Sequence, residues 1–191
     1  MRHIDDVFPQ HLLNAAPAPR RCHETADYLD HLLDERPDLH GAALPYANHD
    51  ELAELVMTRL WNRTRATDLQ ALADISSHEE CDFWIALAIL LRVFPDPQSD
   101  PALIALATHL VDRINAGTWR MRYSETPIVS PRGVELYSKL SEGRPELSLS
   151  EETMSRALAH AAWLARGQKT ATRFAMFNGA PIWAANNLEI D

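Results

Sequence analysis

The feature that most constrains the fold is the apolar run at residues 81–94, CDFWIALAILLRVF. Between Phe83 and Phe94 only Arg92 is charged, so a helix here is apolar on nearly every side and has to be covered by other elements or by lipid. A helix that spans a bilayer needs about 20 apolar residues, and this run is shorter. The sequence therefore predicts a mainly helical single-domain bundle around a buried central helix at about 78–94.

Two signals predict where this central helix begins and ends. Ser77 followed by Glu80 has the spacing of a capping box, and Pro95 cannot continue a helix. The charged residues near the two ends, Asp82 and Arg92, are expected to reach solvent.

Amphipathic spacing and capping signals predict helices on both sides of the central one. We expect them at about 21–35, from Asn48 to about Arg63, from Thr67 to about Ile75, from Pro101 to just before Gly117, from Pro131 to about Ser141, and from Ser148 to just before Gly167. Pro37 is expected to end the first of these, which leaves 36–47 as a loop.

The C-terminal third contains the only β signals. Trp119, Met121 and Tyr123 alternate with polar residues, which predicts a strand at about 118–124. Asn178–Gly179 lies between two apolar runs, which favours a β-hairpin at about 172–185. We therefore expect a helical core at 1–117 and a mixed helix and β-hairpin portion at 118–191, which packs on the same core as a small antiparallel element.

The charge is negative overall and unevenly distributed. The 191 residues have a formal net charge of −9, and residues 1–95 hold 8 basic and 16 acidic side chains, whereas 113–173 hold 10 basic and 6 acidic. Such acidity argues against non-specific nucleic-acid binding by the whole surface. With two cysteines, no signal-peptide pattern and no membrane-length segment, we expect a cytoplasmic protein that does not enter a membrane.

The sequence contains no familiar catalytic motif. The six glycines form neither a dinucleotide fingerprint nor a Walker A loop, so we expect no cofactor and name no catalytic residue. The best metal candidate is His78 with Cys81, together with Cys22 or His23, because sulfur and imidazole suit zinc. The simpler interpretation, which we favour, is two buried thiols and no structural metal.

One cluster has the composition of a partner-binding surface. Its predicted members are Trp119, Arg120, Arg122, Tyr123 and Arg132, with Arg173 and Trp183 from the hairpin. Arginine and aromatic residues are enriched at interface hot spots, and they also suit single-stranded nucleic acid. The alternative is a sheet with its aromatic residues inward and its arginines outward.

The segment from Ser138 to Gly143, with Glu142 before the glycine, resembles the Ser/Thr-x-x-x-Glu-Gly/Asn pattern of the inhibitory helix in Fic-domain regulators and their antitoxins. In that family the glutamate blocks a nucleotide site by pairing with an arginine. The resemblance covers six residues.

These observations support a small non-enzymatic protein that binds a protein partner stoichiometrically, of the immunity, antitoxin or inhibitor type. A nucleic-acid-associated protein that uses the basic, aromatic cluster is the second hypothesis. An enzyme with an unrecognised site is the third.

Overall fold

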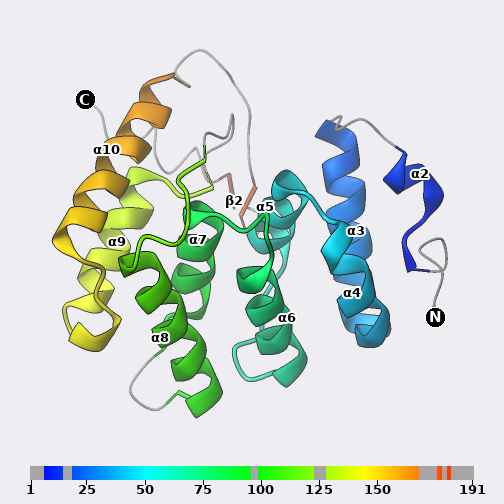
Figure 1. Ribbon diagram of the computed structural model, residues 1–191, viewed down its shortest axis with the longest axis horizontal. Helices are drawn as coiled ribbons and strands as arrows, with labels where there is room; N and C mark the ends of the chain where they lie inside the picture. The colour runs from blue at the N-terminus through cyan, green and yellow to red at the C-terminus, as the bar shows by residue number, and fades with distance from the viewer. Residues whose placement is uncertain are drawn as a thin grey trace.

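The computed structural model describes residues 7–14, 19–95, 99–122 and 128–167, together with two short strands nearer the C-terminal end. It is mainly helical and compact, as the sequence predicts (Figure 1). Its helical elements are α2 (Gln10–Leu13), α3 (Pro19–Glu35), α4 (Pro37–Ala43), η1 (Leu44–Tyr46), α5 (His49–Thr58), α6 (Ala66–Ser77), α7 (Phe83–Val93), α8 (Pro101–Asn115), α9 (Pro131–Ser141), η2 (Pro145–Leu147) and α10 (Glu151–Gly167). None of the helices described is long and apolar enough to cross a membrane.

Helix α7 lies at the centre of the molecule and packs against α5, α6 and α8 (Figure 1). Trp84, Leu87 and Ala88 are buried, as expected for the central helix, while Leu91 on the same helix is half-buried. The helix is buried because its residues leave no polar face for water.

The predicted capping box of the central helix is wrong. Ser77 is the last residue of α6, and α7 begins only at Phe83. The N-cap is Asp82, whose side chain accepts hydrogen bonds from the backbone amides of Trp84 and Ile85, each at 2.9 Å. An aspartate directly before an apolar run satisfies the first free amides of the helix better than the more distant serine can.

The expectation that Asp82 reaches solvent is also wrong, and Arg92 reaches solvent only in part. The side chain of Asp82 is 1% exposed. Arg92 is half-buried, and its guanidinium donates to the carbonyl oxygen of Met57 at 2.7 Å. Burial lowers the pKa of Arg92 to about 10.

The helices at the N-terminal end differ from their predicted bounds in two places. Residues 36–47 are not a loop, because Pro37 occupies the first turn of α4, where its missing N–H is not needed. The Asn48–Glu51 capping box is present, but α5 ends at Thr58 because Arg59 adopts an extended backbone conformation.

The later helix ends agree more closely with the sequence. Asp100 caps α8 by accepting from the amide of Ala102 at 2.8 Å, and Gly117 beyond its end has a φ of 68°, a conformation that favours glycine. Ser130 caps α9. At α10, Ser150 rather than Ser148 accepts the first-turn hydrogen bond, from the amide of Thr153.

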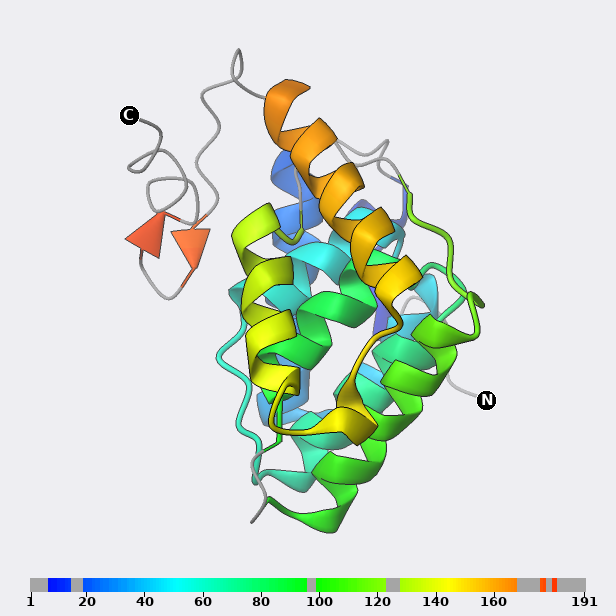
Figure 2. The ribbon, with the colours of Figure 1, turned by 90° about the vertical axis from the view of Figure 1, so that its left-hand side faces the viewer.

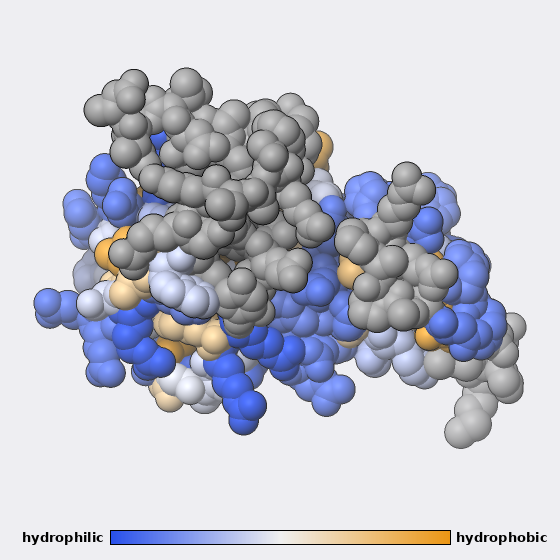
Figure 3. Space-filling model, turned by 90° about the horizontal axis from the view of Figure 1, so that it is seen from above, coloured by the Kyte–Doolittle hydropathy of each residue, from blue (hydrophilic) through white to orange (hydrophobic). Residues whose placement is uncertain are grey.

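Helices α9 and α10 pack together and cover both ends of α7 (Figures 1 and 2). The ring of Tyr137 on α9 meets Phe94 edge-on, with centroids 5.6 Å apart, and His160 on α10 stacks on Trp84 at 5.1 Å. Their outer surfaces carry exposed apolar side chains, which are Leu136, Leu140 and Trp163. From above, Figure 3 shows a small patch of pale and orange surface at this end of the molecule, surrounded by hydrophilic side chains.

The predicted strand at 118–124 is wrong for the residues described, since 118–122 form no strand. This segment is hydrogen-bonded to the first residues of α7. Because a helix end has only a few free backbone groups, it cannot form the continuous row of hydrogen bonds that pairs two strands. Nearer the C-terminus, β1 (Met176–Phe177) pairs antiparallel with β2 (Ala180–Pro181). The rest of 172–185 lies outside the described residues, so the larger β element stays a prediction.

We expect Leu87→Ala to lower the free energy of unfolding by about 2–5 kcal/mol, because it removes a fully buried side chain at the centre of α7. The matched control is Leu60→Ala, since Leu60 is 72% exposed and its truncation is expected to change stability by less than about 0.5 kcal/mol. Urea denaturation of both variants checks the prediction. Equal midpoints for the two variants would contradict the central position of α7.

Candidate functional site

The segment at residues 118–122 follows α8 and lies against the N-terminal end of α7. Two hydrogen bonds, both donated by backbone amides, hold it there. The amide of Phe83 donates to the carbonyl of Arg120 at 3.0 Å, and the amide of Arg122 donates to Oδ2 of Asp82 at 3.2 Å. The segment is therefore fixed to the core although it has no regular secondary structure.

Asp82 is the residue that organises this region. Its buried carboxylate accepts from three backbone amides, those of Trp84, Ile85 and Arg122. It also lies 3.3 Å from Nε2 of His49, the first residue of α5. A buried carboxylate is tolerated only when it is paired and hydrogen-bonded, and the amides, the helix N-terminus and the imidazole together meet that requirement.

His49 lies between two carboxylates. Its Nδ1 is 3.1 Å from Oδ1 of Asp50, and its Nε2 faces Asp82. Burial lowers the pKa of His49, but the hydrogen bonds and charges of Asp50 and Asp82 outweigh it and raise the pKa to about 9. His49 is thus a cation at neutral pH that neutralises the buried Asp82.

The structure brings three of the predicted partner-binding residues together on the 118–122 segment. Trp119 is half-buried, Arg120 is exposed, and Arg122 forms an ion pair with Glu80. Arg132 is exposed in the first turn of α9, outside this segment. Tyr123, Arg173 and Trp183 lie outside the described residues.

Sequence reasoning missed two neighbours of this segment. Arg113, in the last turn of α8, lies over the ring of Trp119 with its guanidinium carbon 4.1 Å from the centroid, and it donates to the carbonyl of Ser76 at 3.0 Å. Glu80 neutralises Arg122. No local pattern links these residues to the segment, whereas Asp82 was detectable as an N-cap signal directly before the apolar run.

The two histidines of the candidate zinc site have other polar contacts. Nδ1 of His78 accepts from the amide of Glu80 at 3.0 Å, and His23 faces Glu54 at 3.2 Å. Burial raises the pKa of the Cys81 thiol to about 12, and burial with nearby carboxylates also raises that of Cys22. Among the described residues, no cluster of three or more His, Cys, Asp or Glu side chains could hold a metal ion.

The segment that resembles the Fic inhibitory motif is the end of α9. Glu142 is the C-cap of that helix and is exposed, as is Gly143 beyond it.

Comparison with known proteins found no match for this chain: no family model, no curated protein and no solved structure matches its sequence or its fold.

We expect the stability of the protein to fall as the pH rises through about 9. The folded-state pKa of His49 is raised from 6.5 to about 9. The stabilisation that the His49 cation gives the folded state is therefore fully present below pH 6.5, and it is lost as the pH rises through the folded-state pKa. The loss is at most about 3 kcal/mol, and smaller because Asp50 is 65% exposed and screened by solvent. Unfolding free energies measured between pH 6 and 10 check this.

The matched control is Asp82→Asn, because asparagine can still cap α7 through its side-chain oxygen but carries no charge. In this variant the stability loss above pH 7 is expected to shrink, and the His49 pKa, measured by NMR, is expected to fall. A wild-type His49 pKa near 6.5 would show that the pairing with Asp82 is wrong.

Proposed function

We propose that this chain is a small cytoplasmic, non-enzymatic binding protein that acts stoichiometrically on a protein partner, of the immunity, antitoxin or inhibitor type. The observation that carries the proposal is the 118–122 segment. It carries the exposed Arg120 next to Trp119, whose half-buried ring packs against the core and under the guanidinium of Arg113, on a stretch of backbone fixed to the central helix.

A prearranged arginine–tryptophan surface is suited to protein recognition. Tryptophan and arginine are the residues most enriched at interface hot spots. Because the segment is hydrogen-bonded to Asp82 and Phe83, little backbone entropy remains to be lost when a partner binds. Arginine forks bind carboxylates bidentately, so the expected partner presents acidic groups to Arg120.

A nucleic-acid partner is the second candidate, supported by the same pairing of arginine with an aromatic ring. Two observations favour protein over nucleic acid. The formal charge of the chain is −9, and the carboxylate of Glu80, which pairs with Arg122, places a negative charge beside the segment. A phosphate backbone carries a negative charge at every nucleotide, so it would be repelled along its length, whereas a protein can present a few carboxylates to Arg120 alone.

Two nucleophile and base candidates near the 118–122 segment favour binding over catalysis. The thiol of Cys81 is buried and its raised pKa keeps it protonated at neutral pH. His49 is protonated between two carboxylates and has no lone pair with which to act as a base. An enzyme with an unrecognised site stays the third alternative.

The test is the affinity of the Arg120→Glu variant for the partner. The partner is first isolated from the native organism by photo-cross-linking, with a photoreactive amino acid in place of Thr118, the exposed first residue of the segment. Charge reversal at Arg120 is expected to weaken binding at least tenfold, about 1.4 kcal/mol. We prefer this single change to one that includes Arg122. Arg122→Glu would place a second carboxylate beside Glu80, and their repulsion would lower the stability of the folded protein.

Lys139→Glu is the matched control, since Lys139 is also an exposed cation in the basic half of the chain. Its affinity for the partner is expected to equal that of the wild type. Wild-type affinity in a folded Arg120→Glu variant would refute the segment as the binding surface. Salt-dependent retention on single-stranded DNA, abolished by Arg120→Glu, would favour the nucleic-acid alternative instead.

A further inference from the structure

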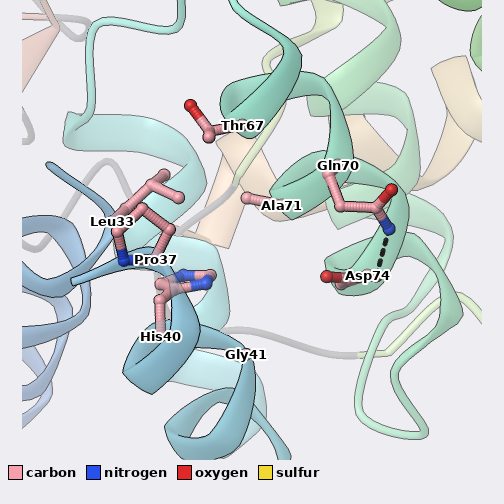
Figure 4. Close-up of a pocket in the computed structure, with 8 residues that line it drawn as sticks. All are labelled: Leu33, Pro37, His40, Gly41, Thr67, Gln70, Ala71 and Asp74. Carbon is pink, nitrogen blue, oxygen red and sulfur yellow. Dashed lines mark hydrogen bonds between the residues drawn. The ribbon is translucent and has the colours of Figure 1, made fainter.

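A pocket of about 90 Å³ lies between α4 and α6, away from the 118–122 segment (Figure 4). One part of its lining is apolar and comes from Leu33, Pro37 and Ala71. The other part is polar and includes His40 and Asp74, which point toward one another across the gap in Figure 4. The pocket thus has an apolar wall and a polar end, the usual composition of a small ligand site.

His40 gives the strongest indication that something binds here. The residue is only 2% exposed, and its Nε2 atom is buried without a hydrogen-bond partner. Buried polar atoms are nearly always satisfied in folded proteins, so the unpartnered Nε2 of His40 beside the pocket indicates a missing polar contact.

The charges around the pocket select a cation. The carboxylate of Asp74 accepts one hydrogen bond, from Nε2 of Gln70 at 2.8 Å, and a carboxylate can accept several. Burial lowers the pKa of His40, and Arg59 lowers it further, while Asp74 and Asp30 partly offset the shift. His40 is therefore neutral at physiological pH, so it does not repel a cation and offers one nitrogen lone pair as an acceptor.

We propose that this pocket binds an alkylammonium group, the chemistry of a lysine side chain or of a small free amine. The methylene chain lies along Leu33, Pro37 and Ala71. The ammonium group donates to Nε2 of His40 and to the free acceptor positions of Asp74. This proposal is independent of the function proposed for the 118–122 segment.

The test is a titration followed by NMR of the full chain, with the backbone amides of Gly41 and Ala71 in the lining as reporters. The probe is n-butylammonium chloride at constant ionic strength, and n-butanol is the neutral control. We expect saturable shifts of both amides with n-butylammonium and none with n-butanol. Absence of saturable shifts with n-butylammonium, or equal shifts with both compounds, would overturn the proposal.

Two variants locate the contact. Asp74→Asn keeps an acceptor for Gln70 but removes the charge, and it is expected to weaken n-butylammonium binding at least tenfold. Asp27→Asn makes the same change at an exposed position on α3 and is expected to leave the affinity unchanged. Unfolding curves confirm that both variants are folded. Equal affinities in the two variants would overturn the role of Asp74.

A second probe distinguishes the sources of the ammonium group. N-acetyl-lysine N-methylamide carries the same side chain on a blocked peptide backbone. Tighter binding of this probe than of n-butylammonium supports a lysine from a protein, and weaker binding supports a small free amine. Either order supports the pocket, provided that Asp74→Asn reduces the affinity of the tighter probe.

Discussion

The burial of α7 is the constraint on which the rest of the structure depends. A helix with almost no polar surface is stable in water only when neighbours surround it, and here α5, α6, α8 and the α9–α10 pair do so. Burying the helix also buries its first free amides, which need acceptors. Asp82 supplies the acceptor, and its charge then requires His49. The surface segment at 118–122 is positioned by this same carboxylate.

A second buried charge accounts for part of the acidity of the N-terminal half. The guanidinium of Arg59, 6% exposed, forms ion pairs with Asp30, Asp34 and Asp68. These pairs join α3, the end of α5 and the start of α6. The hydrogen bonds from Arg59 and Arg65 lower the pKa of Asp34 to about 2. Several of the acidic residues that look like a charged surface in the sequence therefore hold helices together, and removing Arg59 would leave buried Asp68 without its cation.

The two proposed binding surfaces have opposite preferences because of the residues that the fold brings to each. At 118–122, Arg120 stands beside a tryptophan whose other neighbour is Arg113, a surface suited to acidic groups. Between α4 and α6, a carboxylate and a neutral imidazole line an apolar pocket, which is suited to a cation. Each can be tested without the other, because the two surfaces share no residue.

The sequence by itself determined which helix is central and most of the helical segments, although it missed α4. Apolar spacing and local caps act over three or four residues, so Asn48–Glu51, Asp100–Pro101 and Ser130–Pro131 were found correctly. Only the tertiary structure decided the burial and the contacts of residues whose partners are distant in the chain. Asp82 became buried because His49 and Arg122 meet it, and 118–122 became an irregular segment because the end of α7 took its hydrogen bonds. His40 gives no sequence signal at all, since the pocket beside it exists only where α4 meets α6. Local propensity is encoded within a few residues, whereas burial and pairing depend on contacts that form only when the chain is folded.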